Sequence, residues 1–122
     1  MSFEDLLQAN HDYASHHTLS GFDGIAHAGV AMVTCMDSRI DPLAMIGLKP
    51  GDAKILRNPG GRVTDQVLVA LVLGVHLLRV KRILVVQHTR CAMASGDDAS
   101  VADRIMARHG VDIHGMILGS TP

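Results

Sequence analysis

Aromatic residues and cysteines are almost absent from this chain of 122 residues. It has one Tyr, two Phe, no Trp and two Cys, yet 48% of its residues are hydrophobic. The core must therefore consist of aliphatic side chains and methionines. Two cysteines are too few for the disulfide framework that stabilises small secreted domains. We expect both to be reduced or bound to a metal ion, because a disulfide is disfavoured in a reducing cytoplasm.

The chain also lacks an excess of charge and a long apolar segment. The formal net charge is −1 and the Lys and Arg residues are scattered, which does not predict a nucleic-acid partner. The longest apolar stretch, residues 67–80, is too short to span a bilayer and contains His76 and Arg79. The first residues lack the basic start and apolar stretch of a signal peptide. We therefore expect a cytoplasmic protein without a membrane or nucleic-acid partner.

Short apolar runs predict buried parallel strands. The expected strands are residues 30–34, 53–57 and 83–86, with a last short strand at 112–118. Helical patterns separate them, and the expected helices are residues 3–13, a brief one starting at Pro42, 65–79 and 97–109. Asp41 and Thr64 are of the residue types that cap helix N-termini.

This alternation predicts an α/β fold with a parallel sheet of three to four strands and flanking helices. Residues 1–122 are expected to form one domain, with a helical arm and loop at 1–29 and an α/β core at 30–122. The helix at 65–79 is apolar nearly all round, so most of its surface must be covered. In a chain this small, a partner subunit is expected to supply part of that cover.

The two cysteines follow strands of the predicted sheet. Cys35 ends the first strand, while His88 and Cys91 come just after the third. The carboxyl ends of parallel strands are where open α/β sheets place their sites. Two thiolates and one imidazole can bind zinc and leave its fourth position open. The sequence therefore predicts a Cys₂His zinc centre.

Local geometry is expected to bring these side chains together. If residues 35–39 remain extended, Cys35, Asp37 and Arg39 point to one side. One helical turn would place His88 and Cys91 on one face. Asp37 then has two alternatives. It can be a fourth zinc ligand that closes the site, or it can pair with Arg39 and accept a hydrogen bond from a zinc-bound water.

These motifs resemble those of the β-class carbonic anhydrases. The resemblance covers most of the chain and rests on CMDSRIDP at 35–42, GDAKILRNPGGRVTD at 51–65 and ILVVQHTRCAM at 83–93. It implies a lyase that hydrates carbon dioxide reversibly to bicarbonate by a zinc-bound hydroxide. By position, the implied zinc ligands are Cys35, His88 and Cys91.

The resemblance also implies roles for other residues. Asp37 and Arg39 match the family's catalytic dyad that gates the fourth zinc position, and Gly60 and Gly61 match the backbone wall near the substrate. It further implies a homodimer or larger assembly with sites close to the subunit interface. Because two thiolates reduce the charge of the ion, we expect activity to rise on the alkaline side.

The chain departs from the family pattern at Pro59, Gln87 and Ala92 and at its C-terminal end. Ala92 stands where Gly is expected and would crowd the backbone if its φ were positive. Family members usually continue with another helix and a final strand, whereas this chain ends at Pro122. The departure at the C-terminal end gives one alternative, a non-catalytic zinc-binding protein that lacks the C-terminal part. A zinc hydrolase of another small heterocumulene, such as carbon disulfide, is the other.

Four histidines near the N-terminus suggest a second metal site, namely His11, His16, His17 and His27. They lie in a polar segment, and histidines of this kind are more often exposed surface residues than ligands. We therefore interpret them as surface residues.

Overall fold

The computed structural model describes residues 1–19 and 21–120. Its centre is a sheet of three parallel strands in the order β2-β1-β3. These strands are β1 (Val30–Cys35), β2 (Ala53–Asn58) and β3 (Arg82–Val86). β1 lies in the middle and is buried along its whole length, as its apolar, β-branched sequence predicts. The predicted α/β fold with a parallel sheet is confirmed.

Five helical segments accompany the sheet. They are α1 (Glu4–His16), α2 (Pro42–Met45), α3 (Asp65–Leu77), the 3₁₀ helix η1 (Ala92–Ala94) and α4 (Asp98–His109). The Thr64 side chain caps α3 by accepting a hydrogen bond from the Val67 amide, as expected. Asp41 precedes α2 but its side chain makes no capping bond, so only Pro42 at the first position acts as expected.

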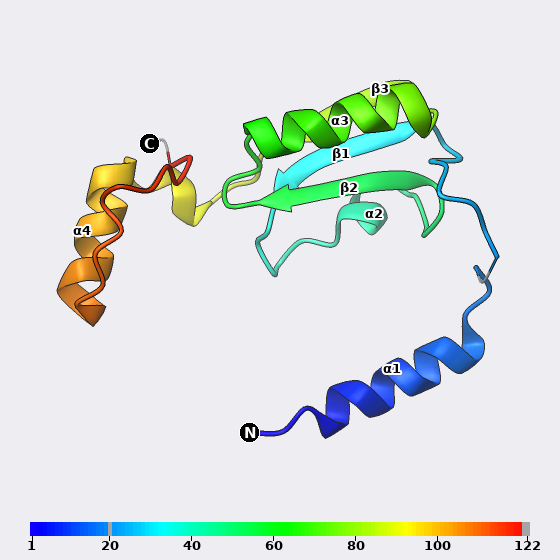
Figure 1. The fold of residues 1–122 in the computed structure, drawn as a ribbon, viewed down its shortest axis with the longest axis horizontal. Helices are drawn as coiled ribbons and strands as arrows, with labels where there is room; N and C mark the ends of the chain where they lie inside the picture. Colours follow the sequence, from blue (N-terminus) through cyan, green and yellow to red (C-terminus); the bar gives the residue numbers. More distant parts are fainter. Residues whose placement is uncertain (20, 121–122) are drawn as a thin grey trace.

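The expected strand at 112–118 is wrong. This segment has no strand structure and runs back along α4 instead, seen in Figure 1 as red beside orange. Asp98 of α4 accepts hydrogen bonds from the backbone amides of Leu118 and Ser120. The Asp112 carboxylate also bonds the amide of His114 and forms a local turn. These bonds to carboxylates replace the sheet bonds that a fourth strand would require.

The core lies between α3 and the sheet. Val67 and Leu71 of α3 pack with Ala31 and Val33 of β1 in one buried cluster, which Val80 completes. Only this side of α3 is covered by the chain itself. α1 has no buried residue, and Figure 1 shows both α1 and α4 lying away from the sheet.

Many apolar side chains of α3 and β3 are therefore exposed, and we call this set the α3–β3 surface. It comprises Leu68, Val69, Val72, Leu73, Val75, Leu77, Ile83 and Val85. Within the described residues, none of the helices is both long and apolar enough to cross a membrane.

Candidate metal centre

Cys35, His88 and Cys91 come together at the carboxyl edge of the sheet. One ligand atom from each lies within 4.8 Å of the other two. Cys35 is the last residue of β1, while His88 and Cys91 lie on the loop that follows β3. The convergence predicted from strand ends is therefore what the fold produces.

The spacing of the two sulfur atoms fits a shared tetrahedral ion. Both cysteines are free, and their Sγ atoms are 3.8 Å apart. Two sulfurs at the usual zinc–sulfur distance of about 2.3 Å, separated by a tetrahedral angle, would also lie about 3.8 Å apart. The pair is thus arranged to accept a metal ion without rearrangement of the strand ends.

His88 is oriented with its metal-binding nitrogen toward the thiols. Its Nδ1 lies 2.8 Å from the carbonyl oxygen of Thr89, which fixes Nδ1 as the donor and leaves the lone pair on Nε2. Nε2 is buried and has no hydrogen-bond partner within the described residues. A buried polar atom without a partner is costly, and a metal ion would satisfy this one.

The two loops that carry these side chains form turns, whereas an extended segment and a helical turn were expected. Residues 36–40 are not extended, because the Asp37 carboxylate bonds the backbone amide of Arg39 at 2.8 Å and turns the chain. His88 and Cys91 are joined by a turn in which Arg90 has a φ of 58°, not by a helical turn. Ala92 begins η1 and does not have a positive φ, so it causes no crowding there.

Arg39 holds the Asp37 carboxylate beside the three ligand atoms. Its Nε lies 3.0 Å from Oδ1, and its Nη2 lies 2.6 Å from Oδ2. The bonds from Arg39 keep the pKa of the Asp37 carboxyl well below its ordinary value, so the group is ionised. Oδ2 of Asp37 is 3.7 Å from Nε2 of His88. The carboxylate therefore borders the position that a metal ion would take while remaining bound to Arg39.

The surroundings of the Cys35 thiol lower its pKa towards neutral pH. Burial alone raises its pKa, but the His88 imidazole and the backbone amides of Gly60 and Asp37 outweigh this effect and lower the pKa to about 7. The Gly60 amide donates to Sγ at 3.3 Å. A thiolate is the form of cysteine that binds metal ions.

Gly60 and Gly61 pack against Cys35 rather than around open space. Gly61 has a φ of 62°, and a Cβ added to it would lie 2.9 Å from the Thr34 carbonyl carbon and 3.0 Å from the Cys35 amide nitrogen. Gly61 therefore allows the 58–62 turn to approach the end of β1, whereas a Cβ on Gly60 would meet Arg62 and Met93. Pro59 is the member of this turn that lines the adjacent pocket.

A pocket of about 480 Å³ opens beside the thiols. Asp37 and Arg39 line its polar side, and the rest of the wall is largely apolar. The apolar wall residues are Met36, Pro59, Ala92 and Met93. A small uncharged molecule could reach Cys35 and Cys91 through this pocket.

Arg57 and Arg90 take part in the site although sequence reasoning gave them no role. Arg57 donates to the carbonyl oxygens of Cys35 and Asp37, and the Arg90 carbonyl accepts a bond from Arg39. Both interactions involve backbone carbonyls, which leave no trace in residue type. The one indication in the sequence was that Arg57 lies within residues 51–65, one of the segments on which the family resemblance rests.

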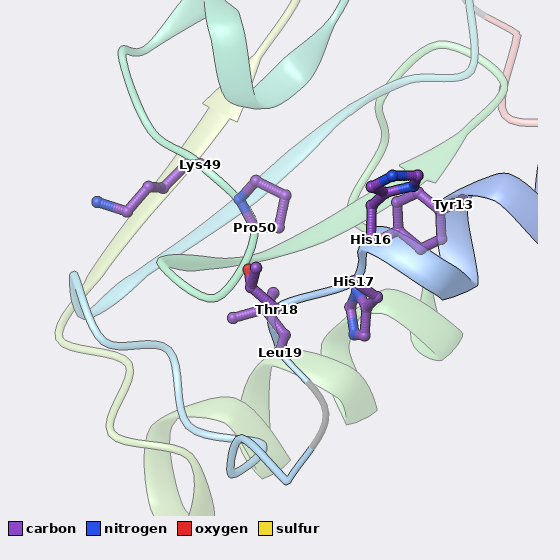
Figure 2. A pocket seen from close by; sticks show the side chains of 7 residues that line it. All are labelled: Tyr13, His16, His17, Thr18, Leu19, Lys49 and Pro50. Carbon is purple, nitrogen blue, oxygen red and sulfur yellow. The ribbon is translucent and has the colours of Figure 1, made fainter.

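The N-terminal histidines are not gathered into a group of metal ligands in residues 1–19 and 21–120. Among the described residues, Cys35, His88 and Cys91 are the one group of three such ligands close enough to share an ion. His16 and His17 line a separate pocket of about 340 Å³ with Tyr13 and Lys49, and Figure 2 shows Lys49 pointing away from both histidines. His27 pairs with Asp23 at 2.7 Å. These positions agree with surface residues.

Comparison with known proteins gives one consistent family. A family model described as carbonic anhydrase matches residues 30–111. Beta-carbonic anhydrase 1 of Mycobacterium tuberculosis is 36% identical over 112 residues, which cover 88% of this chain and 66% of that protein. Carbon disulfide hydrolase of Acidithiobacillus thiooxidans is 30% identical over 119 residues, or 93% of this chain and 54% of that protein.

Solved structures agree with these sequence relatives. Carbonic anhydrase from Streptococcus mutans has a TM-score of 0.87 and 35% identity, covering 100% of this chain and 75% of that one. Carbonic anhydrase from Glaciozyma antarctica has a TM-score of 0.77 and 32% identity, covering 88% of this chain and 65% of that one. The chain thus spans a little under two thirds of the first curated relatives, at 66% of their length.

Proposed function

Because the chain belongs to the β-class carbonic anhydrase family, we propose that it catalyses the reversible hydration of carbon dioxide to bicarbonate. Cys35, His88 and Cys91 would hold the zinc ion. The observation that carries this proposal is the buried Nε2 of His88, which has no hydrogen-bond partner among the described residues and lies beside two thiols spaced 3.8 Å apart. A zinc ion bound there would supply hydroxide, because zinc lowers the pKa of bound water from about 15.7 towards about 7, and two thiolate ligands make this lowering smaller.

Asp37 and Arg39 orient the reaction in this proposal. The ionised Asp37 carboxylate is placed to accept a hydrogen bond from the attacking water, which fixes the direction of its lone pair. Arg39 keeps the carboxylate from turning onto the metal as a fourth ligand, since its bonds to both oxygens would have to break first. Gly60 and Gly61 would bring the backbone of the 58–62 turn close to Cys35 near the substrate, while Pro59 and the other apolar pocket residues would admit carbon dioxide.

Zinc content and hydration rate test this function together. The purified protein is expected to hold one zinc per chain and to hydrate carbon dioxide in a stopped-flow assay, with a rate that rises on the alkaline side. Cys91→Ser is expected to lose both properties, because a neutral hydroxyl replaces a thiolate ligand. Zinc at one per chain without hydration would favour the non-catalytic alternative, and a protein without zinc would refute both.

Carbon disulfide is a second candidate substrate, favoured by a specific observation. A relative with 30% identity is a carbon disulfide hydrolase, and the pocket wall has four apolar side chains that suit a sulfur-containing heterocumulene. The two functions are separated by measuring hydrogen sulfide release from carbon disulfide beside carbon dioxide hydration. Hydrolysis of carbon disulfide without hydration of carbon dioxide would replace the first proposal by the second.

A second copy of the chain is the partner that we propose. The accessible surface of the chain is 8704 Å². A compact protein of 13.0 kDa is expected to expose only about 6,300 Å². The excess of about 2,400 Å² is in the range that one subunit buries in an obligate dimer. The α3–β3 surface supplies apolar area for such an interface.

We further propose that residues 30–122 form the zinc-binding core and that residues 1–29 form an arm. The single-domain organisation and a cytoplasmic location fit this reading, because two unpaired thiols persist in a reducing compartment. Mass in solution tests the assembly, and a folded monomer would contradict it.

A further inference from the structure

Arg57 connects the edge strand β2 to the central strand β1 at the end of the sheet where the candidate metal centre lies. It is the penultimate residue of β2, and it pairs in register with Thr34 on β1. Its side chain reaches past the end of β1. Nε donates to the carbonyl oxygen of Cys35 at 2.9 Å, and Nη2 donates to the carbonyl oxygen of Asp37 at 2.7 Å.

The backbone held by Arg57 has little other support from the sheet. The amide of Met36 bonds the carbonyl of Asn58 at 2.9 Å, and beyond this bond the chain leaves β1 in a turn. The Asp37 carbonyl has one further contact, a long 3.4 Å bond from the amide of Ile40. Together with the 2.8 Å bond from the Arg39 amide to the Asp37 carboxylate, the two charge-assisted bonds from Arg57 are therefore the short bonds that fix this turn.

We propose that Arg57 is a positioning residue that sets the direction of the Cys35 thiol and the Asp37 carboxylate. It touches neither the ligand atoms nor the pocket. The nitrogens Nε and Nη2 of a guanidinium lie on one rigid edge, so two bonds from that edge fix the relative orientation of the two carbonyls. Fixing them restrains the backbone torsions of residues 35–37, on which both side chains depend. The effect expected on zinc binding rests on the proposed function, whereas the two hydrogen bonds from Arg57 do not.

A methionine at this position removes both donors and keeps a side chain of comparable length. In Arg57→Met we expect zinc affinity, measured by competition with a chromophoric chelator, to fall about 10–100-fold, as is typical when a residue supporting metal ligands is lost. In the metal-free protein, amide hydrogen exchange of residues 36–40 is expected to accelerate about tenfold or more, while α3 keeps its protection. Lys54→Met is the matched control at the other end of β2, and it should change neither quantity.

Arg57→Lys separates the fixed geometry from the charge. A lysine retains the positive charge, but its single nitrogen lacks the rigid two-nitrogen edge. We expect this variant to keep the thermal midpoint of the wild type and still to lose several-fold in zinc affinity. Wild-type affinity in Arg57→Lys would overturn the two-bond role, even if Arg57→Met fails to fold.

The proposal has outcomes that distinguish it from the proposed function. Unchanged exchange of residues 36–40 in Arg57→Met, or faster exchange across the whole sheet, would overturn the positioning role. A wild-type protein that binds no zinc would refute the proposed function alone, because the exchange measurement requires no metal.

Discussion

At the scale of single residues, Gly61 is where the metal centre leaves no room for a side chain. Its φ of 62° favours glycine, and an added Cβ would lie 2.9 Å from the Thr34 carbonyl carbon. We predict that Gly61→Ala lowers the free energy of unfolding by more than about 2 kcal/mol, from backbone strain and overpacking combined. Zinc affinity should fall as well, because the clash displaces the backbone that carries Cys35. Chemical denaturation and chelator competition measure the two effects.

Gly47 provides the matched control for this prediction. It has a similar φ of 70°, but an added Cβ would meet no atom within 4 Å. Gly47→Ala should therefore show only the strain of the left-handed conformation, about 1 kcal/mol, with unchanged zinc affinity. Equal losses of stability in the two variants would contradict the close approach at Gly61.

Residue types and strand ends were enough to predict that Cys35, His88 and Cys91 converge. Cys35 ends β1 and His88 follows β3, and the carboxyl ends of these adjacent parallel strands lie at the same edge of the sheet. The contacts that orient them could not be predicted, because the carbonyls of Cys35 and Arg90 accept bonds that depend on turn geometry. The residues that converge were predicted correctly, but their local conformations were not. Turns replace the extended segment expected at residues 35–39 and the helical turn expected between His88 and Cys91.

At the scale of elements, the end of α3 contains a residue in an unfavourable conformation. Arg79 follows the C-cap Leu78 and has a φ of 63°, and the next amide, of Val80, bonds the Gly74 carbonyl. This arrangement closes helices and usually has glycine at the position of Arg79. Arg79→Gly is predicted to raise the free energy of unfolding by about 0.5–1 kcal/mol. Arg108→Gly, within α4, should instead destabilise the protein by about 1 kcal/mol. Denaturant titrations of both variants test the contrast, and a destabilised Arg79→Gly would refute it.

The C-terminal segment, residues 111–120, is held to α4 by groups that titrate. Hydrogen bonds that His114 donates to Asp103 and then Asp112 raise its pKa above 6.5, so this contribution is complete below that value and is lost as pH rises through the raised pKa. The amides of Leu118 and Ser120 lower the pKa of Asp98 below 3.8, so its contribution is present above that value and is lost at more acidic pH. The segment is predicted to be most protected between these limits.

Hydrogen exchange of residues 111–120 across pH, corrected for the intrinsic rate, measures this protection. His114→Gln should remove the decline on the neutral side, and Asp98→Asn should remove the decline on the acidic side. A wild-type profile without either decline would show that these ion pairs do not hold the segment.

The same carboxylate bonds explain why the strand predicted at 112–118 was wrong. The sequence shows apolar periodicity, but it does not show which side chains bind the backbone.

At the scale of the whole molecule, the composition of α3 predicted that much of its apolar surface would be left uncovered. An all-apolar helix in a chain of this size required cover beyond the chain, and only Val67, Leu71 and Gly74 of α3 are in fact buried. What the sequence could not show is that β3 would be exposed too, because its apolar run is typical of a buried strand. Exposed apolar surface of this extent marks an interaction site.

We therefore predict that one charged residue on the α3–β3 surface dissociates the assembly. Val72 is half exposed on α3, and Val72→Glu would bury an unpaired carboxylate if a second copy covered it. Size exclusion with light scattering is expected to give the wild type a mass of twice the chain's 13.0 kDa. The dimer dissociation constant of Val72→Glu should be at least about 100-fold larger than that of the wild type. Ile117→Glu is the control, since Ile117 is exposed on the C-terminal segment and lies outside this surface. A Val72→Glu dimer as tight as the wild type would exclude α3 from the interface. Loss of the dimer in both variants would instead place the interface elsewhere or reflect a general effect of charge.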